Sequence, residues 1–313
     1  MTQTANTLGT QKITTLLVKQ AIPASIGILV MSLNMIVDTI FVGQWIGSMA
    51  IAAITVVLPI VFLISSIGMG IGIGGSSIIS RALGARAIDK AYLTFGNQIS
   101  LTLVLSVIFV LVGILFYEPL LLLFGANGAI LAPATSYFNV VLYGVPFLAF
   151  AMLGNPVIRA EGKPKFAMYA MIIPAISNIL LDIIFIKFLY LWMFGACLAT
   201  SISYAACGLF IFGFFISKKS ELSILPKNFV LSLPIVKEIV QLGGVTIARQ
   251  GTISVLMIVL NATLFTYGGE NAIAVYGIIN RVMMFALFPV LGVTQGFLPI
   301  AGYNIGAKNN ERV

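Results

Sequence analysis

The 313-residue chain has no histidine and only two cysteines, Cys197 and Cys207. Without histidine it cannot form a Ser-His-Asp triad, a histidine proton relay or a histidine-ligated metal site. Both cysteines fall inside one apolar segment, which argues against a disulfide framework and against a cysteine-based metal site. We therefore do not expect an enzyme, and we expect no cofactor.

Charge is also scarce. Charged residues make up 8% of the chain and hydrophobic residues 60%, with a mean hydropathy of +1.10. A soluble domain has about 25% charged residues, so much of this apolar surface must face lipid. The net charge of +8 does not indicate a nucleic-acid partner, because the basic residues occupy short stretches between apolar segments. The composition predicts a multi-pass protein of the cell (inner or plasma) membrane.

Long apolar runs predict an all-α, polytopic fold. A bilayer core of about 30 Å needs roughly 20 apolar residues per helix, and transmembrane strands would be shorter and alternate in polarity. Eight such runs occur, at 14–41, 50–79, 92–116, 128–156, 165–187, 194–216, 239–266 and 271–301.

The basic residues also predict the orientation, because cytoplasmic loops are enriched in Lys and Arg. Lys187 is the one basic residue in a connection on the opposite side. The basic residues of the other side are Lys12, Lys19, Arg81, Arg86, Lys90, Arg159, Lys163, Lys165, Lys218, Lys219, Lys227, Lys237, Lys308 and Arg312. We therefore expect a cytoplasmic N-terminus.

An internal repeat appears when the chain is shifted by 222 residues. Without a gap, "MAIAAI" (Met49–Ile54) falls on "NAIAVY" (Asn271–Tyr276), and "GARAIDK" (Gly84–Lys90) falls on "GAKNNER" (Gly306–Arg312). Such a register over about 70 positions indicates duplication. Because six predicted helices separate the copies, both start on the cytoplasmic side.

The repeat suggests three parts: a six-helix lobe over 1–217, a cytoplasmic linker over 218–238, and the start of a second, repeat-related lobe over 239–313. Two complete lobes would have twelve helices, whereas this sequence supplies eight. We therefore expect either a fragment or a truncated gene product.

Four charged residues lie well inside the predicted helices: Asp38, Asp182, Arg249 and Arg281. A charge at the bilayer centre costs about 3 kcal/mol on insertion scales, so each is expected to face a cavity or a partner. The arginines are expected to bind carbonyl groups or acids of other helices in a structural role. The sequence leaves their roles open.

The two acids share a spacing. Asn34 and Asp38 are four residues apart, as are Asn178 and Asp182, so each pair projects from one helix face. Two carboxylates with amide neighbours, and the Thr200 hydroxyl, predict an oxygen-rich pocket for H⁺ or Na⁺. The alternative is that each acid separately hydrogen-bonds a neighbouring helix.

Five segments together resemble the prokaryotic multidrug and toxin extrusion (MATE) family: "NMIVDTIFVGQ", "GGSSIISRALGA", "IRAEGKPKFAM", "SNILLDIIFI" and "PIAGYNIGAKNNERV". The resemblance covers essentially the whole chain. It implies two six-helix lobes around a V-shaped cavity, alternating access, and export of organic cations driven by inward H⁺ or Na⁺. A monomer is expected for a full-length member.

The resemblance also implies a coupling site formed by Asp38, Asn178, Asp182 and Thr200, which are also the ligands if the ion is Na⁺. It implies a substrate cavity lined by Asn34, Asp38, Asn155 and Asp182. The predicted seventh helix has no acid in its span, so no coupling site in the second lobe is supported. The sequence does not distinguish H⁺ from Na⁺, nor does it identify the drugs.

Two other functions stay open. A lipid-linked saccharide flippase of the same superfamily would need a strongly cationic cavity, whereas here two acids balance two arginines within the membrane. A transport-inactive membrane fragment would insert without a second lobe to move against. An intramembrane enzyme is the least favoured, because no nucleophile and base pair is present.

Overall fold

The computed structural model covers residues 1–313 and describes the backbone except at 1–2, 125, 127–129, 218 and 225. The side chains of 3–6, 48–49, 52, 59, 253–255, 257–259, 261–262, 264–266, 268–282 and 284–286 also lie outside the described part.

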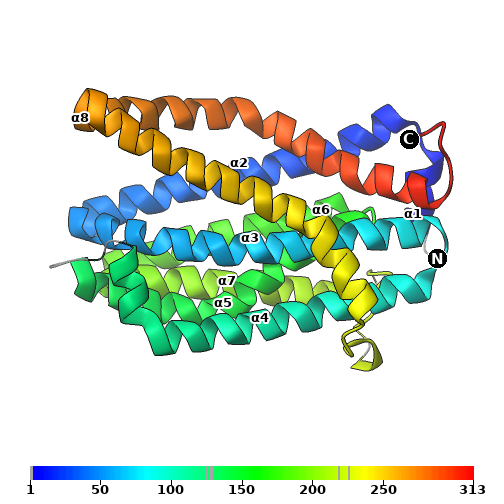
Figure 1. The fold of residues 1–313 in the computed structure, drawn as a ribbon, viewed down its shortest axis with the longest axis horizontal. Coiled ribbons are helices and arrows are strands. Elements are labelled where there is room, and N and C mark those ends of the chain that lie inside the picture. Colours follow the sequence, from blue (N-terminus) through cyan, green and yellow to red (C-terminus); the bar gives the residue numbers. More distant parts are fainter. Residues whose placement is uncertain (1–2, 125, 127–129, 218, 225) are drawn as a thin grey trace.

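The described ranges contain helices and no strand, which confirms the all-α prediction. The elements are α1 (Gln3–Thr10), α2 (Ile13–Trp45), α3 (Ser48–Gly84), α4 (Ile88–Leu123), α5 (Leu131–Ala160), α6 (Pro164–Asp182), η2 (Ile183–Phe188), α7 (Trp192–Ile216), η3 (Pro226–Asn228) and α8 (Leu233–Gly306). Figure 1 shows the long helices lying side by side, with both chain termini at one end of the bundle.

The long helices follow from the apolar runs, because a backbone in lipid must satisfy its hydrogen bonds within each helix. Within the described residues, six helices are long and apolar enough to cross a membrane, and they correspond to the first six predicted segments. Many of their large apolar side chains are exposed at the bundle surface, as expected for contact with lipid. The chain is a multi-pass membrane protein.

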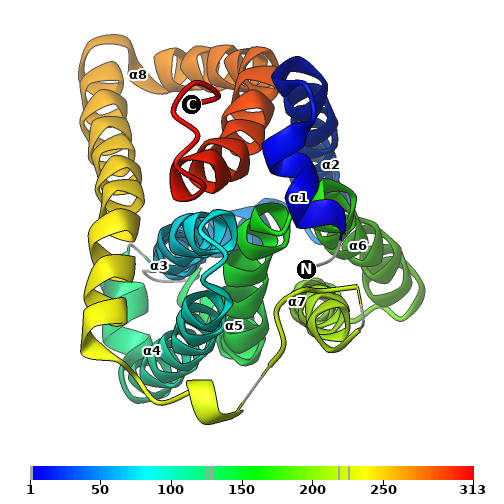
Figure 2. The same ribbon diagram turned by 90° about the vertical axis from the view of Figure 1, so that its right-hand side faces the viewer.

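The last helical element, α8, folds back on itself. A straight helix of its 74 residues would be about 110 Å long. Near its start, Ile239 lies against Gly74 of α3, and near its end Tyr303 lies against Gly84 of the same helix. Figures 1 and 2 show the reversal between two arms. The predicted helices 239–266 and 271–301 correspond to these arms, although helical backbone also continues between them.

The contacts between the arms of α8 and the first helices repeat at the offset found in the sequence. A Cβ added at Gly70 would lie 3.3 Å from the carbonyl oxygen of Gly243. At the positions 222 residues away, a Cβ added at Gly292 would lie 3.0 Å from the carbonyl oxygen of Ala21. The contact of α3 with the first arm of α8 is therefore repeated in the contact of the second arm with α2.

The same relation holds at the end of the bundle that carries the termini. A Cβ at Gly84 would overlap the backbone of Tyr303, and a Cβ at Gly306 would overlap the backbone of Arg81. These two contacts exchange under the 222-residue shift. Such reciprocal contacts are what a two-fold axis between duplicated segments produces. They support the duplication, while the division into lobes stays a prediction.

Side chains of α4 hold the segment between α7 and α8. The Asn97 side chain, which is fully buried, accepts a hydrogen bond from the backbone N–H of Ser232 at 2.6 Å. The Ser100 hydroxyl donates to the carbonyl oxygen of Phe229 at 2.7 Å, and the Tyr92 hydroxyl to that of Glu221 at 3.0 Å. The predicted linker is therefore attached to the first six helices. Its last residues are helical, because α8 begins at Leu233, inside the range 218–238 predicted for the linker.

A buried carboxylate makes a further attachment. Glu161, at the end of α5, has no exposed surface. Its oxygens accept hydrogen bonds from the Ser220 hydroxyl at 2.7 Å, the Glu221 N–H at 3.1 Å and the Leu222 N–H at 3.4 Å. Burial raises the pKa of Glu161 to about 7, although these hydrogen bonds and Lys163 offset part of that shift. The linker contact therefore involves a group that titrates near neutral pH.

Adjacent glycines allow a matched test of the contact between α3 and α8. Gly243→Ala should lower stability by about 1–3 kcal/mol, because its methyl group would overlap the backbone of Gly70, which cannot rotate away. Gly244→Ala should leave stability unchanged or raise it by up to about 1 kcal/mol, because its Cβ meets nothing within 4 Å and alanine favours helix. Thermal unfolding in detergent measures both changes. Equal melting temperatures for the two variants would contradict the close contact.

Glu161 predicts a pH dependence of stability. Its pKa rises from 4.5 to about 7 on folding, so the folded chain holds this proton more tightly than the unfolded chain. The resulting stabilisation is present at low pH and is lost as the pH rises through the folded value. The melting temperature should fall as the pH rises from about 4.5 to about 7, and Glu161→Gln should flatten this slope. Asp89→Asn, an exposed change, is the control; an unaltered slope in the glutamine variant would refute the assignment.

Candidate functional site

Two helices bring the membrane-embedded acids together. Asp38 lies in the last third of α2, and Asp182 is the last residue of α6. The side chains of the two acids interact directly. Asp182 is fully buried, whereas Asp38 is partly exposed. The pair therefore extends from the interior of the bundle toward the accessible face of α2.

The two asparagines form a second contact between the same helices. The Asn34 side-chain amide donates to the Asn178 side-chain carbonyl at 3.1 Å. Each asparagine precedes its acid by four residues, so the amide pair and the acid pair lie one helical turn apart. The shared spacing in the sequence thus corresponds to two successive contacts between α2 and α6.

The turn that follows Asp182 is wider than an α-helix. In η2 the hydrogen bonds join residues five apart, as in the bond from the Leu189 N–H to the Ile184 carbonyl at 2.9 Å. The sequence predicted one continuous helix over 165–187, and the structure divides it immediately after the acid. Short π-helical turns occur frequently at functional sites, where they change the direction of a side chain.

Two tyrosines that the sequence analysis did not select complete the surroundings of Asp38. Tyr137 of α5 and Tyr204 of α7 lie close enough to Asp38 for an electrostatic interaction. The Tyr137 hydroxyl also hydrogen-bonds Thr200, whose own hydroxyl donates to the Ala196 carbonyl at 3.0 Å. Tyr204 follows Thr200 by four residues, a spacing that could have indicated a shared face.

Asn155 lies elsewhere. Its side-chain amide donates to the backbone carbonyl of Ala167 at 2.7 Å, and its carbonyl oxygen accepts from Arg159 at 3.1 Å. Ala167 and Asp182 are fifteen residues apart on α6, or about 22 Å along the helix. The structure therefore does not bring Asn155 to the acids, and places it in a contact between α5 and α6 near the opposite end.

No described contact joins Arg249 to this site. Arg249 is exposed on the first arm of α8, and neither of the ion pairs among the described residues includes it. The expectation that it faces a partner within the bundle therefore has no support. The side chain of Arg281 lies outside the described residues.

The arrangement can hold a proton or a small cation. Neither carboxyl oxygen of Asp182 has a hydrogen-bond donor among the described residues, although both are buried. A buried charge without a partner is costly, so the acid pair needs a proton or a cation when it lies in a membrane. Carboxyl oxygens such as those of Asp38 and Asp182 are the hard ligands that Na⁺ prefers. The Asn178 oxygen accepts from Asn34, and Thr200 is linked to Asp38 through Tyr137. Among the described residues, no cluster of three acidic or sulfur-bearing side chains suggests a divalent metal site.

Comparisons with known proteins show the family of this chain. The family model described as MatE matches residues 23–184 and 246–313. The multidrug export protein MepA of Staphylococcus haemolyticus is 32% identical over 293 residues, which are 94% of this chain and 64% of that protein. The chain thus spans less than two thirds of the length of this curated relative, which is named as an export protein rather than an enzyme.

Two solved structures share the fold over the whole chain. One, described as "Crystal structure of MATE in complex with MaD3S", has a TM-score of 0.94 and 31% identity, and 70% of it is covered. The other, a transporter of the MOP superfamily from Pyrococcus furiosus described by the reverse polarity of its binding pocket, has a TM-score of 0.92 and 31% identity, with 69% covered. Because the family model matches well over half of the residues, the chain belongs to the MatE family, multidrug and toxin extrusion.

Proposed function

We propose that the protein exports amphipathic organic cations in exchange for H⁺ or Na⁺, by alternating access. The observation that carries this proposal is the direct interaction of Asp38 with the buried Asp182 inside the membrane. Two adjacent carboxyl groups can take up one proton or one cation as a unit, and a site of this kind couples ion entry to a change in helix contacts. The names of the relatives as multidrug export proteins support the choice of cargo.

The mechanism follows from the position of the acids between helices. When a cation enters from outside, it neutralises the pair and removes the repulsion between α2 and α6. When it leaves, Asp38, the more accessible acid, is free to attract a cationic drug. The contacts of Asp38 with Tyr137 and Tyr204 extend the change to α5 and α7. Ion and drug thus favour different states of one site, which is the requirement for exchange.

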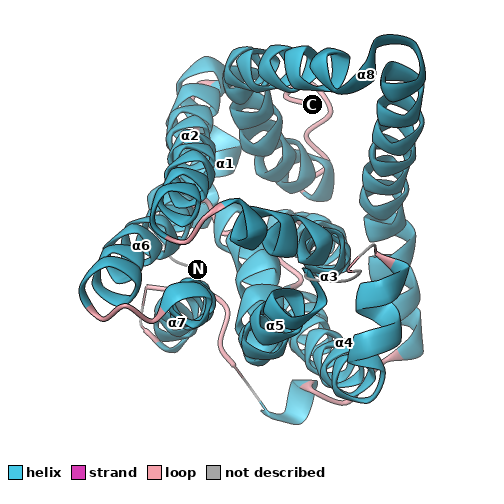
Figure 3. Cartoon of the chain, turned by 90° about the vertical axis from the view of Figure 1, so that its left-hand side faces the viewer, coloured by secondary structure: helices cyan, strands magenta, loops and turns pink. Residues whose placement is uncertain are grey.

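We also propose that the end of the bundle carrying the termini is cytoplasmic. At this end Glu238 of α8 forms ion pairs with Arg81 at 3.1 Å and with Lys90 at 3.1 Å. Figure 3, seen from the opposite end, shows the chain from the side that would face outward. The excess of basic residues at one side supports this orientation. We retain the expectation of a monomer for the full-length protein.

A saccharide flippase is less well supported. The described residues of the site provide two carboxyl groups, two amides and phenol groups, and Arg249 is exposed on α8 with no described contact to them. A pyrophosphate group would meet like charge at Asp38 and Asp182, which costs binding energy unless cations compensate it.

Removal of either acid should stop transport. In proteoliposomes containing the protein, Asp38→Asn or Asp182→Asn should reduce gradient-driven ethidium efflux to the level of empty vesicles, because an amide cannot take up the coupling ion. Asp89→Asn makes the same chemical change at the exposed start of α4 and should transport normally. Full efflux by both site variants would exclude this site from coupling, and failure of all proteins alike would argue for a transport-inactive fragment.

Separately imposed gradients should identify the ion. An inward gradient of either H⁺ or Na⁺ should start ethidium export, while an inward K⁺ gradient of equal size should not, because the site is small and rich in carboxyl and amide oxygens. Fluorescence of ethidium bound to trapped DNA reports its movement. Equal rates with an H⁺ or Na⁺ gradient, with a K⁺ gradient and with no gradient at all would show uncoupled leakage and contradict antiport.

A further inference from the structure

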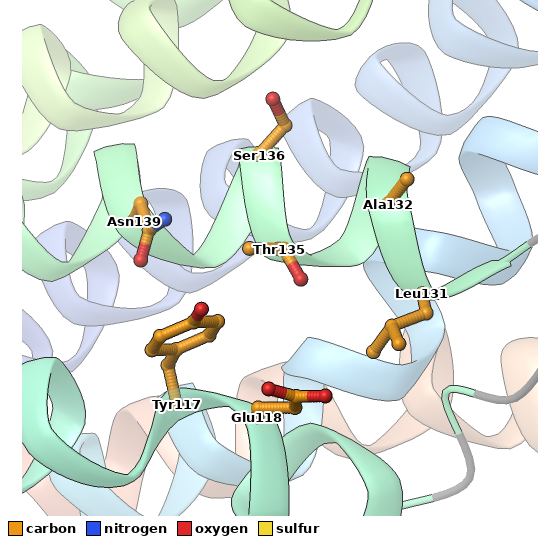
Figure 4. A pocket seen from close by; sticks show the side chains of 7 residues that line it. All are labelled: Tyr117, Glu118, Leu131, Ala132, Thr135, Ser136 and Asn139. Atoms are coloured by element: carbon orange, nitrogen blue, oxygen red, sulfur yellow. The ribbon is translucent and has the colours of Figure 1, made fainter.

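A polar pocket of about 520 Å³ lies between α4 and α5, far from the acid pair in sequence. Its lining includes Tyr117 and Glu118 of α4, together with Thr135 and Asn139 of α5. Figure 4 shows the Glu118 carboxylate and the Thr135 hydroxyl facing each other across it, with Tyr117 beside Asn139.

A break in α4 forms the pocket. Phe116 has non-helical backbone angles (φ −125°, ψ 25°), and Pro119 follows within the same helix. Proline has no N–H, so the carbonyl group of Leu115 loses its hydrogen bond within the helix. The break and the proline thus flank Glu118, which is exposed at the opening of the pocket.

The pocket lies at the level of a membrane interface. It is at the end of the bundle opposite the termini, where α4 ends and α5 begins (Figures 1 and 4). Tyr190 and Trp192, which join η2 to α7, are exposed at the same end. Exposed Tyr and Trp side chains mark the head-group region of a bilayer. With the orientation proposed above, the pocket opens into the outer leaflet.

Its charge favours a cation. Both ion pairs among the described residues involve Glu238, so Glu118 has no basic partner in that part of the chain. A single carboxylate with hydroxyl and amide groups provides too few strong ligands for Ca²⁺, which takes six to eight oxygens. An ammonium group fits better, because it needs one counter-charge and a few hydrogen-bond acceptors.

The surroundings favour an amphiphile. Leu115 is 71% exposed and Leu123 is 79% exposed, on either side of Glu118 along α4. Leu122 follows Glu118 by four residues and therefore lies on the same helix face. An alkyl chain attached to the bound head group could extend along these side chains within the lipid.

We propose that this pocket binds the ammonium head group of an amphiphile in the outer leaflet, with Glu118 as counter-ion and Thr135 and Asn139 as hydrogen-bonding groups. The site is separate from the acid pair of Asp38 and Asp182. Two sources share this chemistry: an aminophospholipid such as phosphatidylethanolamine, and an amphipathic cationic drug that has reached the outer leaflet. The pocket alone does not require the protein to transport either.

The test uses a primary alkylammonium probe with a photoreactive diazirine in its chain, added to the protein in phosphatidylglycerol nanodiscs. After illumination, mass spectrometry should find the label on peptides of 115–124 and 131–139. Glu118→Gln should lower this labelling by about tenfold, the effect of losing one charge-assisted hydrogen bond of about 1.4 kcal/mol. Asp89→Asn is the control and should label as the wild type does, and melting temperatures verify that both variants fold.

Competition identifies the source. Displacement of the probe by phosphatidylethanolamine assigns the site to a lipid, and displacement by ethidium alone assigns it to a cationic drug. Equal labelling of wild type and Glu118→Gln, or labelling that neither competitor reduces, would overturn the proposal, because the alkyl chain alone would then account for binding. The labelling does not depend on transport, so its outcome is independent of the ethidium efflux experiment.

Discussion

A carboxylate inside a hydrocarbon layer needs a proton, a cation or hydrogen-bond donors, and this requirement explains the arrangement of the first helices. Asp182 is fully buried without a donor among the described residues, so its closest counterpart is the neighbouring carboxyl group of Asp38. The Asn34 to Asn178 hydrogen bond holds α2 and α6 together one turn away. Because the two acids cannot both stay charged and unpaired in lipid, whatever neutralises them also alters how these helices interact.

Much of this arrangement could be predicted from the sequence. Apolar runs located the membrane helices, since in lipid the length of an apolar segment almost determines its structure. The i to i+4 spacing of an asparagine and an acid, present in both α2 and α6, indicated one face on each helix. The ungapped 222-residue repeat indicated a relation that the contacts of Gly70 and Gly292 then display.

Other features could not be predicted, because they depend on how helices are rotated against one another. Tyr137 approaches Asp38 across nearly one hundred residues of sequence, and no local pattern marks it. The same reason explains why Asn155, which the family resemblance assigned to the substrate cavity, contacts Ala167 instead. The hydrogen bonds of Glu161 to the linker were also unforeseen, since a charged residue in a basic loop is ordinarily expected to be solvated.

The reciprocal glycine contacts have a consequence for how such a protein could arise. Gly84 at the end of α3 contacts the backbone of Tyr303 in α8, and Gly306 at the end of α8 contacts the backbone of Arg81 in α3. Each copy of the repeat therefore supplies both the glycine and the backbone that the glycine contacts. The pair formed by Gly302 and Ser80 is its own equivalent under the 222-residue shift. A surface with this property is isologous, the kind by which two identical subunits form a dimer. A self-complementary contact of this kind is compatible with an origin by fusion of two copies of one chain, with the segment that Glu161 holds as the tether between them.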